Sequence, residues 1–327
     1  MAAALVLLLG AGACAGDEQD ALQPGGDRTG ERRGPEHGGD ASAASPSIPA
    51  GHEVVEPTAP PLAERFVPAG TAGELARRLT RAHGLVSDPG TRGDLLAAAA
   101  FETQLLYRQL ARTPEWQGEV FFRMRGLRPV AELHVEARRS LRSVLTTLTD
   151  QLPAWAVVEP PPVHELIRYY REGERVHGVE WEVLAAINLV ETGFGKIDGL
   201  SSAGAQGPMQ FIPSTWAAYG EGDVEDPHDA ILGAANYLAA SGAASGDVQG
   251  ALYAYNNHPG YVAGISAYAE ILRRDPAALR GLHAWQIIYL STIGDIWLPV
   301  GYRETEPVPV RTYVRQHPEH HLGPATS

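Results

Sequence analysis

Two neighbouring segments decide the fold: VEWEVLAAINLVETGFG at residues 179–195 and SSAGAQGPMQ at residues 201–210. The first is typical of a helix, because its apolar side chains recur at helical spacing and its alanines favour that conformation. Glu191 lies on the apolar face, since it follows Leu184 by seven positions and Ile187 by four. Glycines then end the helix, as glycine does just past a C-terminus.

The position of Glu191 has a chemical consequence. A carboxyl group on an apolar face loses solvation, which raises its pKa, and the negative end of the helix dipole acts in the same direction. A carboxyl group that stays protonated near neutral pH can serve as a general acid. A buried glutamate that only hydrogen-bonds the backbone is the alternative explanation for such a residue.

Three motifs follow one another from Glu191 onward. They are ETGF at residues 191–194, SSAGAQGPMQFIPSTW at residues 201–216, and AYN at residues 254–256. This ordered set resembles the lytic transglycosylases, which cleave peptidoglycan and have a lysozyme-like fold. The second motif is most similar to the membrane-bound B type. Its Gly-Pro-Met-Gln differs from the Gly-Leu-Met-Gln of the soluble type. The resemblance covers roughly residues 160–300.

The resemblance implies a reaction with one protein acid. Glu191 would protonate the glycosidic oxygen and then, as a carboxylate, take a proton from the 6-hydroxyl of the sugar. The N-acetylmuramyl acetamido group would stabilise the cationic centre, and the product would be a 1,6-anhydro sugar. The residues that the resemblance places around the substrate are Ser201, Gln210, Tyr255, Asn256, Met209 and Phe194.

Each neighbour of Glu191 also has a purely structural explanation. Ser201 and Gln210 could satisfy loop backbone groups, and Tyr255 could be a core tyrosine with a bonded hydroxyl. Tyr255 follows Val248 by seven positions, on an apolar row of a predicted helix that Asp247 caps. Its side chain therefore points inward, and the resemblance in the preceding motifs leads us to expect that its hydroxyl points at Glu191. Met209 and Phe194 are expected to form apolar walls of the cleft.

Two other functions fit the same residues. Glycoside hydrolases usually need two carboxylates, so an acid within residues 221–226 could activate water, as in a goose-type muramidase. A cell-wall-binding protein that keeps the fold without turnover is the second alternative.

Charge and cysteine content exclude other classes. The 327 residues carry a formal charge of −13, which argues against a nucleic-acid partner. Cys14 is the only cysteine, so no intramolecular disulfide can form. We find no phosphate loop and no nucleophile elbow, and we predict no cofactor.

The N-terminal residues predict export to the cell envelope, to the periplasm or beyond. Residues 2–13 form an apolar run of signal-peptide length, and Cys14 follows it like the lipidated cysteine of a bacterial lipoprotein. Lipid at Cys14 would attach the chain to a membrane, whereas ordinary cleavage within residues 1–14 would release it. Residues 15–61 are poor in large apolar side chains and predict a disordered linker.

The remaining chain predicts an all-α protein. Residues 62–152 predict a helical N-terminal domain with helices near 74–83, 93–110 and 130–148. The resemblance implies a lysozyme-like domain at residues 160–303, and the sequence predicts a helix at 282–290 near its end. Residues 304–327 predict a flexible tail. Its histidines, His317, His320 and His321, have no supporting ligand cluster in the sequence, so we predict no metal site.

Overall fold

The computed structural model describes residues 66–323. The predicted signal segment at 1–14, the lipidation of Cys14 and the linker at 15–61 lie outside the described residues. Within them the structure is mainly helical, with twelve α-helices and a few short strands, so the predicted all-α class is confirmed. No helix in this described range is long and apolar enough to cross a membrane.

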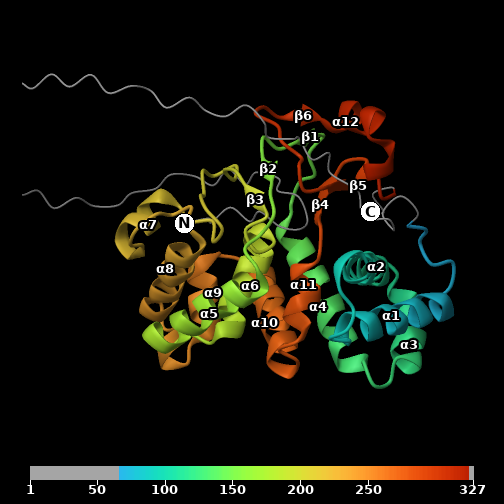
Figure 1. The fold of residues 1–327 in the computed structure, drawn as a ribbon, viewed down its shortest axis with the longest axis horizontal. Coiled ribbons are helices and arrows are strands. Elements are labelled where there is room, and N and C mark those ends of the chain that lie inside the picture. The colour runs from blue at the N-terminus through green and yellow to red at the C-terminus, as the bar shows by residue number, and fades with distance from the viewer. Residues whose placement is uncertain (1–65, 324–327) are drawn as a thin grey trace, which may run out of the picture. The chain divides into compact units, whose positions relative to one another are not determined.

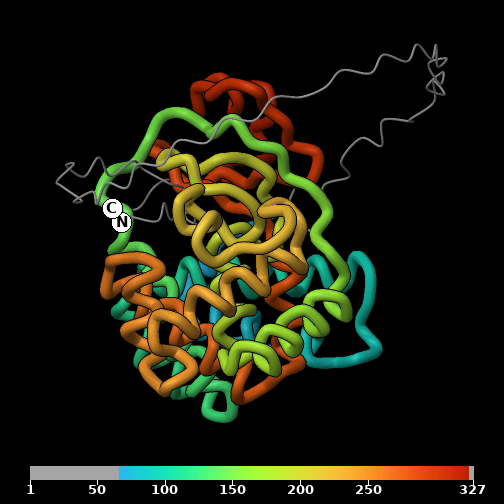
Figure 2. Tube along the Cα trace, turned by 90° about the vertical axis from the view of Figure 1, so that its left-hand side faces the viewer, coloured from blue at the N-terminus to red at the C-terminus, as the bar shows by residue number. Residues whose placement is uncertain are grey.

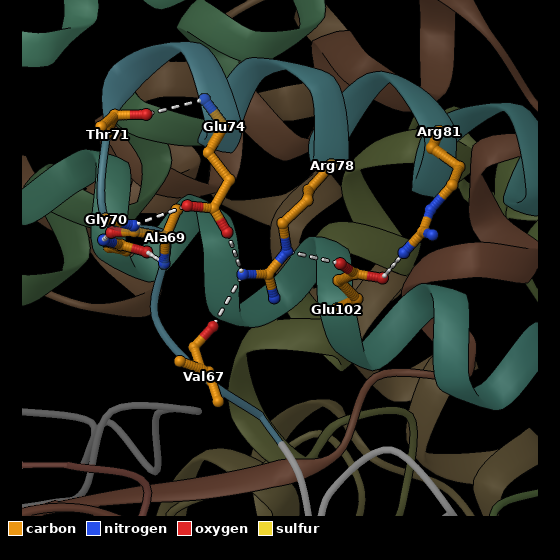
Figure 3. Close-up of polar contacts among 9 residues, drawn as sticks. Val67, Ala69, Gly70, Thr71, Glu74, Arg78, Arg81 and Glu102 are labelled. Carbon is orange, nitrogen blue, oxygen red and sulfur yellow. Dashed lines mark hydrogen bonds and ion pairs between the residues drawn. The ribbon is translucent and has the colours of Figure 1, made fainter.

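The first helices build a small core of their own. Apolar side chains of α1, α2 and α3 meet there, with Leu75, Leu79 and Leu106 fully buried. Polar contacts tie the outer faces of α1 and α2, since Arg78 and Arg81 both pair with Glu102, as Figure 3 shows. The helices are α1 (Ala72–Ser87), α2 (Gly93–Arg112), α3 (Pro114–Arg123) and α4 (Arg128–Val144).

The second group of helices surrounds α6 (Trp181–Thr192). Every residue of α6 except Glu182 is buried, which is the pattern of a helix enclosed on all sides. Figure 1 shows α5, α6, α8, α9 and α10 gathered together, and α10 contacts both α6 and α4. The other helices here are α5 (Val163–His177), α7 (Pro213–Tyr219), α8 (Pro227–Ala240), α9 (Val248–Tyr255), α10 (Pro259–Arg274) and α11 (Ala278–His283).

Short antiparallel strands close the structure. β1 (Gln151–Leu152) pairs with β6 (Val308–Pro309), and β2 (Ala156–Val157) pairs with β3 (Ile197–Asp198). β3 follows the end of α6, so this pairing holds the chain just beyond Glu191. Figure 2 shows the extended segment after α4, in green, running beside the C-terminal elements, in red.

The predicted helix at 282–290 is wrong. Its first part belongs to α11, and the rest forms β4 (Ile287–Ser291), which pairs with β5 (Gly294–Leu298). Both strands are buried along their whole length, so the alternation that identifies a half-exposed strand is missing from the sequence. The β-branched and aromatic residues of 287–289 favour the extended conformation.

The predicted flexible tail at 304–327 is also wrong for much of its length. β6 leads into α12 (Val310–Gln316) and a 3₁₀ turn, η3 (Pro318–His320). Val310 and Tyr313 are buried against the core, which supplies the apolar burial that orders this segment.

Contacts cross between the predicted N-terminal and catalytic domains. Arg108 and Arg112 of α2 both bond the carboxylate of Asp295 in β5, and the Arg108–Asp295 pair is almost fully buried. Side chains of α4 share one core with those of α6 and α10. The two segments therefore pack as neighbours, and the boundaries at 62–152 and 160–303 stay predictions.

Candidate active site

The site begins at the C-terminal end of α6. Gly193 caps the helix with a left-handed φ of 63°, as the glycine after Glu191 predicts. Glu191 lies in the last turn and is 1% exposed. The prediction that this carboxyl group shares the apolar face of its helix is confirmed.

One hydrogen bond orients the carboxyl group. The hydroxyl of Tyr261 donates to Oε1 of Glu191 over 2.8 Å, whereas the buried Oε2 has no hydrogen-bond partner among the described residues. Burial raises the pKa of Glu191 to about 8, although the bond from Tyr261 acts to lower it. The group is therefore protonated at neutral pH, as a general acid must be.

Tyr261, and not Tyr255 as predicted, donates the hydrogen bond to Glu191. The hydroxyl of Tyr255 donates to the backbone carbonyl of Met209 over 2.7 Å, so its predicted bond to Glu191 is wrong. The two tyrosine rings are nearly parallel, at 4°, with centroids 6.3 Å apart. A signal for Tyr261 was present, since it begins the buried row of α10 that continues with Ile265 and Tyr268 at i+4 and i+7.

Backbone carbonyls of the segment at 207–211 accept hydrogen bonds from side chains of α6 and α9. Nδ2 of Asn188 and Oγ1 of Thr192 both donate to the carbonyl of Pro208, over 2.9 and 2.7 Å. Tyr255 holds the next carbonyl, that of Met209. These bonds fix the segment beside Glu191, and two of the three donors come from the same helix as Glu191.

Gln210 combines backbone strain with an unsatisfied side chain. Its φ is 51°, a left-handed value that is rare outside glycine. Nε2 donates to the carbonyl of Gly207 over 3.0 Å, and Oε1 is buried without a hydrogen-bond partner in the described structure. Strained and unsatisfied groups of this kind concentrate at functional sites. The side chain is therefore a candidate to receive a hydrogen bond from substrate.

The other predicted residues are less exposed than a binding role suggests. Oγ of Ser201 accepts the N–H groups of Ala203 and Ala205, which is the structural explanation. Asn256 is 5% exposed. The side chains of Met209 and Phe194 are fully buried, so neither forms an open cleft wall as predicted.

Three of the acids in residues 221–226 already hold hydrogen bonds. Asp226 caps α8 by accepting two backbone N–H groups, and Asp223 accepts the N–H of Glu225. The carboxylate of Glu225 has a hydrogen bond from the backbone of Gly207. Asp223 and Asp226 are therefore bonded within their own loop and helix cap, whereas Glu225 is bonded to the segment that includes Gly207.

A small cavity opens beside Gln210. Its volume of about 20 Å³ is enough for roughly one water molecule, so a sugar ring enters only if the walls move. The lining residues are Gln210, Phe211, Ile212, Thr215, Tyr237, Ala254 and Tyr255.

Two clusters among the described residues have metal-ligating side chains close together. One contains His317, Glu319 and His320, and the other contains Asp226, His228 and Asp229. Neither cluster includes Glu191, Gln210, Tyr255 or Tyr261.

Residues 168–273 match the model of the transglycosylase SLT domain family, a range that includes α6, the segment at 207–211 and most of α10. No solved structure matches the chain. The helical fold, the buried acid and this match agree with one another. The chain therefore contains a transglycosylase SLT domain, the lysozyme-like domain of lytic transglycosylases, which are enzymes that act on peptidoglycan.

Proposed function

We propose that Glu191 alone supplies the acid and the base for cleavage of the β-1,4 bond between N-acetylmuramic acid and N-acetylglucosamine. The observation that carries the proposal is a carboxyl group that is buried, protonated near pH 7 and, among the described residues, hydrogen-bonded at one oxygen only. Because Oε1 accepts the bond from Tyr261, the acidic proton resides on Oε2.

The first step transfers that proton to the glycosidic oxygen. As the C–O bond breaks, positive charge develops at the anomeric carbon of the muramyl residue, and the substrate's own acetamido oxygen stabilises it. The leaving sugar departs with a new hydroxyl group, and Glu191 is left as a carboxylate. Tyr261 stabilises that carboxylate with its hydrogen bond.

The second step returns a proton to Glu191. The carboxylate takes the proton of the muramyl 6-hydroxyl, whose oxygen attacks the anomeric carbon and closes the 1,6-anhydro ring. The enzyme regains its starting state without consuming water. One carboxyl group suffices because the substrate provides both the stabilising group and the nucleophile.

Gln210 is proposed to bind the sugar. Its Oε1, which has no hydrogen-bond partner in residues 66–323, can accept an N–H or O–H from substrate, which would satisfy a buried acceptor. Tyr255 is proposed to act through Met209, whose carbonyl it holds. Roles for Ser201 and Asn256, and the membrane-bound B-type assignment, rest on the motif resemblance.

The products distinguish this reaction from hydrolysis by a goose-type muramidase. Purified peptidoglycan is digested with the enzyme and the soluble muropeptides are weighed by mass spectrometry. We expect 1,6-anhydro ends, lighter than reducing ends by one water. Reducing ends would instead indicate that an acid of the 221–226 loop activates water.

The same digestion tests a non-catalytic role. A protein that only binds walls would sediment with purified sacculi without releasing muropeptides. The buried, protonated state of Glu191 favours turnover, because a binding residue gains nothing from a desolvated carboxyl group.

Export, and lipid attachment at Cys14, are proposed from the sequence. Work on peptidoglycan requires a place in the cell envelope. Labelling with a fatty-acid analogue tests the lipid: the intact chain should incorporate label in a bacterial host, and Cys14→Ser should not. Label retained in Cys14→Ser would contradict the proposal.

A further inference from the structure

The C-terminal segment brings three metal-ligating side chains together. Nδ1 of His317 lies 3.7 Å from Oε1 of Glu319, and Nε2 of His320 lies 3.6 Å from the same oxygen. The three ligand atoms all lie within 4.8 Å of one another. We propose that His317, Glu319 and His320 bind one Zn²⁺ ion, with water as the fourth ligand.

The spacing fits a small tetrahedral ion. Zinc binds histidine nitrogen and carboxylate oxygen at about 2.0–2.2 Å, which places neighbouring ligand atoms about 3.4 Å apart. The two distances to Glu319 exceed that value by only a few tenths of an ångström. The rings of His317 and His320 are stacked, with centroids 5.1 Å apart and planes at 9°, so the His317 ring must turn before both nitrogens can meet one ion. His317 and Glu319 are partly exposed, at 45% and 40%, which leaves room for that rotation.

The buried ligand is already oriented. Tyr313 contacts Nδ1 of His320 at 2.8 Å, which leaves Nε2 directed toward Glu319. With the metal bound, Nδ1–H would donate to the Tyr313 oxygen, as the second ring nitrogen of a ligating histidine usually does. The indole of Trp297 packs edge-on against the same ring, at 4.9 Å between centroids, and limits its rotation.

The other histidines and carboxylates that could bind a metal already hold hydrogen-bond partners. His321 already bonds the carbonyl of Ile293 through Nε2. In the other cluster, Asp226 caps α8, while His228 contacts Glu172 and Asp229 through its two ring nitrogens. Carboxylate and imidazole groups that already hold these partners must give them up to bind a metal.

The bound metal would have a structural role. It would join the residue after α12 to η3, and this segment contacts β5 through the backbone bond from Leu322 to Asp295. Asp295 is the carboxylate that Arg108 and Arg112 share. Zinc would therefore reinforce the attachment of the C-terminal segment to the folded chain, separately from the chemistry at Glu191.

Zinc binding to the full, untagged chain tests the proposal. Zn²⁺ is titrated in competition with a chromophoric chelator, and thermal unfolding is followed with and without Zn²⁺. We expect one zinc equivalent and a higher Tm. His317→Ala and Glu319→Gln should each weaken binding at least tenfold and abolish the zinc-dependent rise in Tm.

His228→Ala is the matched control, because it removes a histidine from the other cluster and should leave zinc affinity unchanged. The two ligand variants should fold, since both side chains are partly exposed. The proposal is overturned if the intact chain binds no zinc, or if His317→Ala and Glu319→Gln bind it as tightly as the intact chain. The second result would place the ion at other histidines.

Discussion

The hydroxyl of Tyr261 donates to Oε1 of Glu191 over 2.8 Å and so joins residues seventy positions apart, from α10 and α6. This contact gives the acid two opposing influences. Burial raises the pKa of Glu191, and the hydrogen bond, which favours the carboxylate, lowers it. The net pKa of about 8 keeps the proton available at neutral pH without making the carboxylate inaccessible later in the reaction.

Replacing Glu191 with glutamine should abolish most turnover while preserving the fold. The amide keeps the shape of the side chain and can still accept from Tyr261, but it has no proton to donate. We expect muropeptide release to fall by at least ~10²-fold, the usual scale of general acid catalysis. Circular dichroism should show a native helical spectrum. Near-normal release by a folded variant would refute the assignment.

Two tyrosine variants separate direct from indirect contact with the acid. Tyr261→Phe removes the bond that lowers the pKa of Glu191, so the alkaline limb of kcat/KM against pH should move to higher pH. Tyr255→Phe releases the Met209 carbonyl and should reduce the rate without moving that limb. The pH profiles of kcat/KM, measured on soluble glycan fragments, distinguish the two roles. A shift in Tyr255→Phe alone would reverse the two roles.

Much of the helical fold could be predicted from the sequence, because amphipathic spacing and caps act locally. Asp226, Pro227 and the αL glycine after α6 mark their helix ends through chemistry confined to a few residues. β4 was missed because burial on both faces leaves no alternating pattern to detect. The order of α12 depends on burial of Val310 and Tyr313 against the core, and the preceding β6 pairs with the distant β1, so both contacts join distant parts of the chain.

The site was only partly predictable for the same reason. The burial of Glu191 follows from positions within its own helix. The partner of its carboxyl group depends on how α9 and α10 pack against α6. From the sequence, either Tyr255 or Tyr261 could donate this hydrogen bond. In the packed structure Tyr261 donates to the carboxyl group of Glu191, and Tyr255 donates to the carbonyl of Met209.

The ionisation of Glu191 should make stability depend on pH. Between about pH 4.5 and 8 the folded carboxyl group is protonated while the unfolded one is ionised, so the folded state holds the extra proton. Its contribution is therefore full below the unfolded pKa and is lost as pH rises toward 8, by up to about 1.4 kcal/mol per pH unit.

Urea unfolding of the wild type and Glu191→Gln at pH 5 and pH 7.5 isolates this effect, because other titrating groups are common to both chains. The free energy of unfolding of the wild type should fall relative to that of the variant as pH rises. A difference that stays constant between the two pH values would show that the carboxyl group has an ordinary pKa.

Two glycines in the second motif should differ sharply in their tolerance of alanine. At Gly207, φ is 69° and an added Cβ would collide with the carbonyl oxygen of Val224. Gly204 has a similar φ of 75° but open space around it. Gly204→Ala should therefore cost about 1 kcal/mol of conformational strain, and Gly207→Ala should cost several times more. Thermal unfolding of both variants provides the comparison, and equal losses would contradict it.

Substitution of Gln210 should separate stability from activity. The left-handed backbone costs a non-glycine residue about 1–2 kcal/mol, and glycine would remove that cost. Gln210→Gly should therefore match or exceed the wild type in Tm while releasing fewer muropeptides, since it has no amide to accept from the sugar. Gln210→Ala keeps the backbone cost and loses the same amide, so it should be as inactive and less stable than Gln210→Gly. Full activity in both variants would remove Gln210 from the substrate site, and a lower Tm for glycine would show that the side chain's bond to Gly207 outweighs the strain.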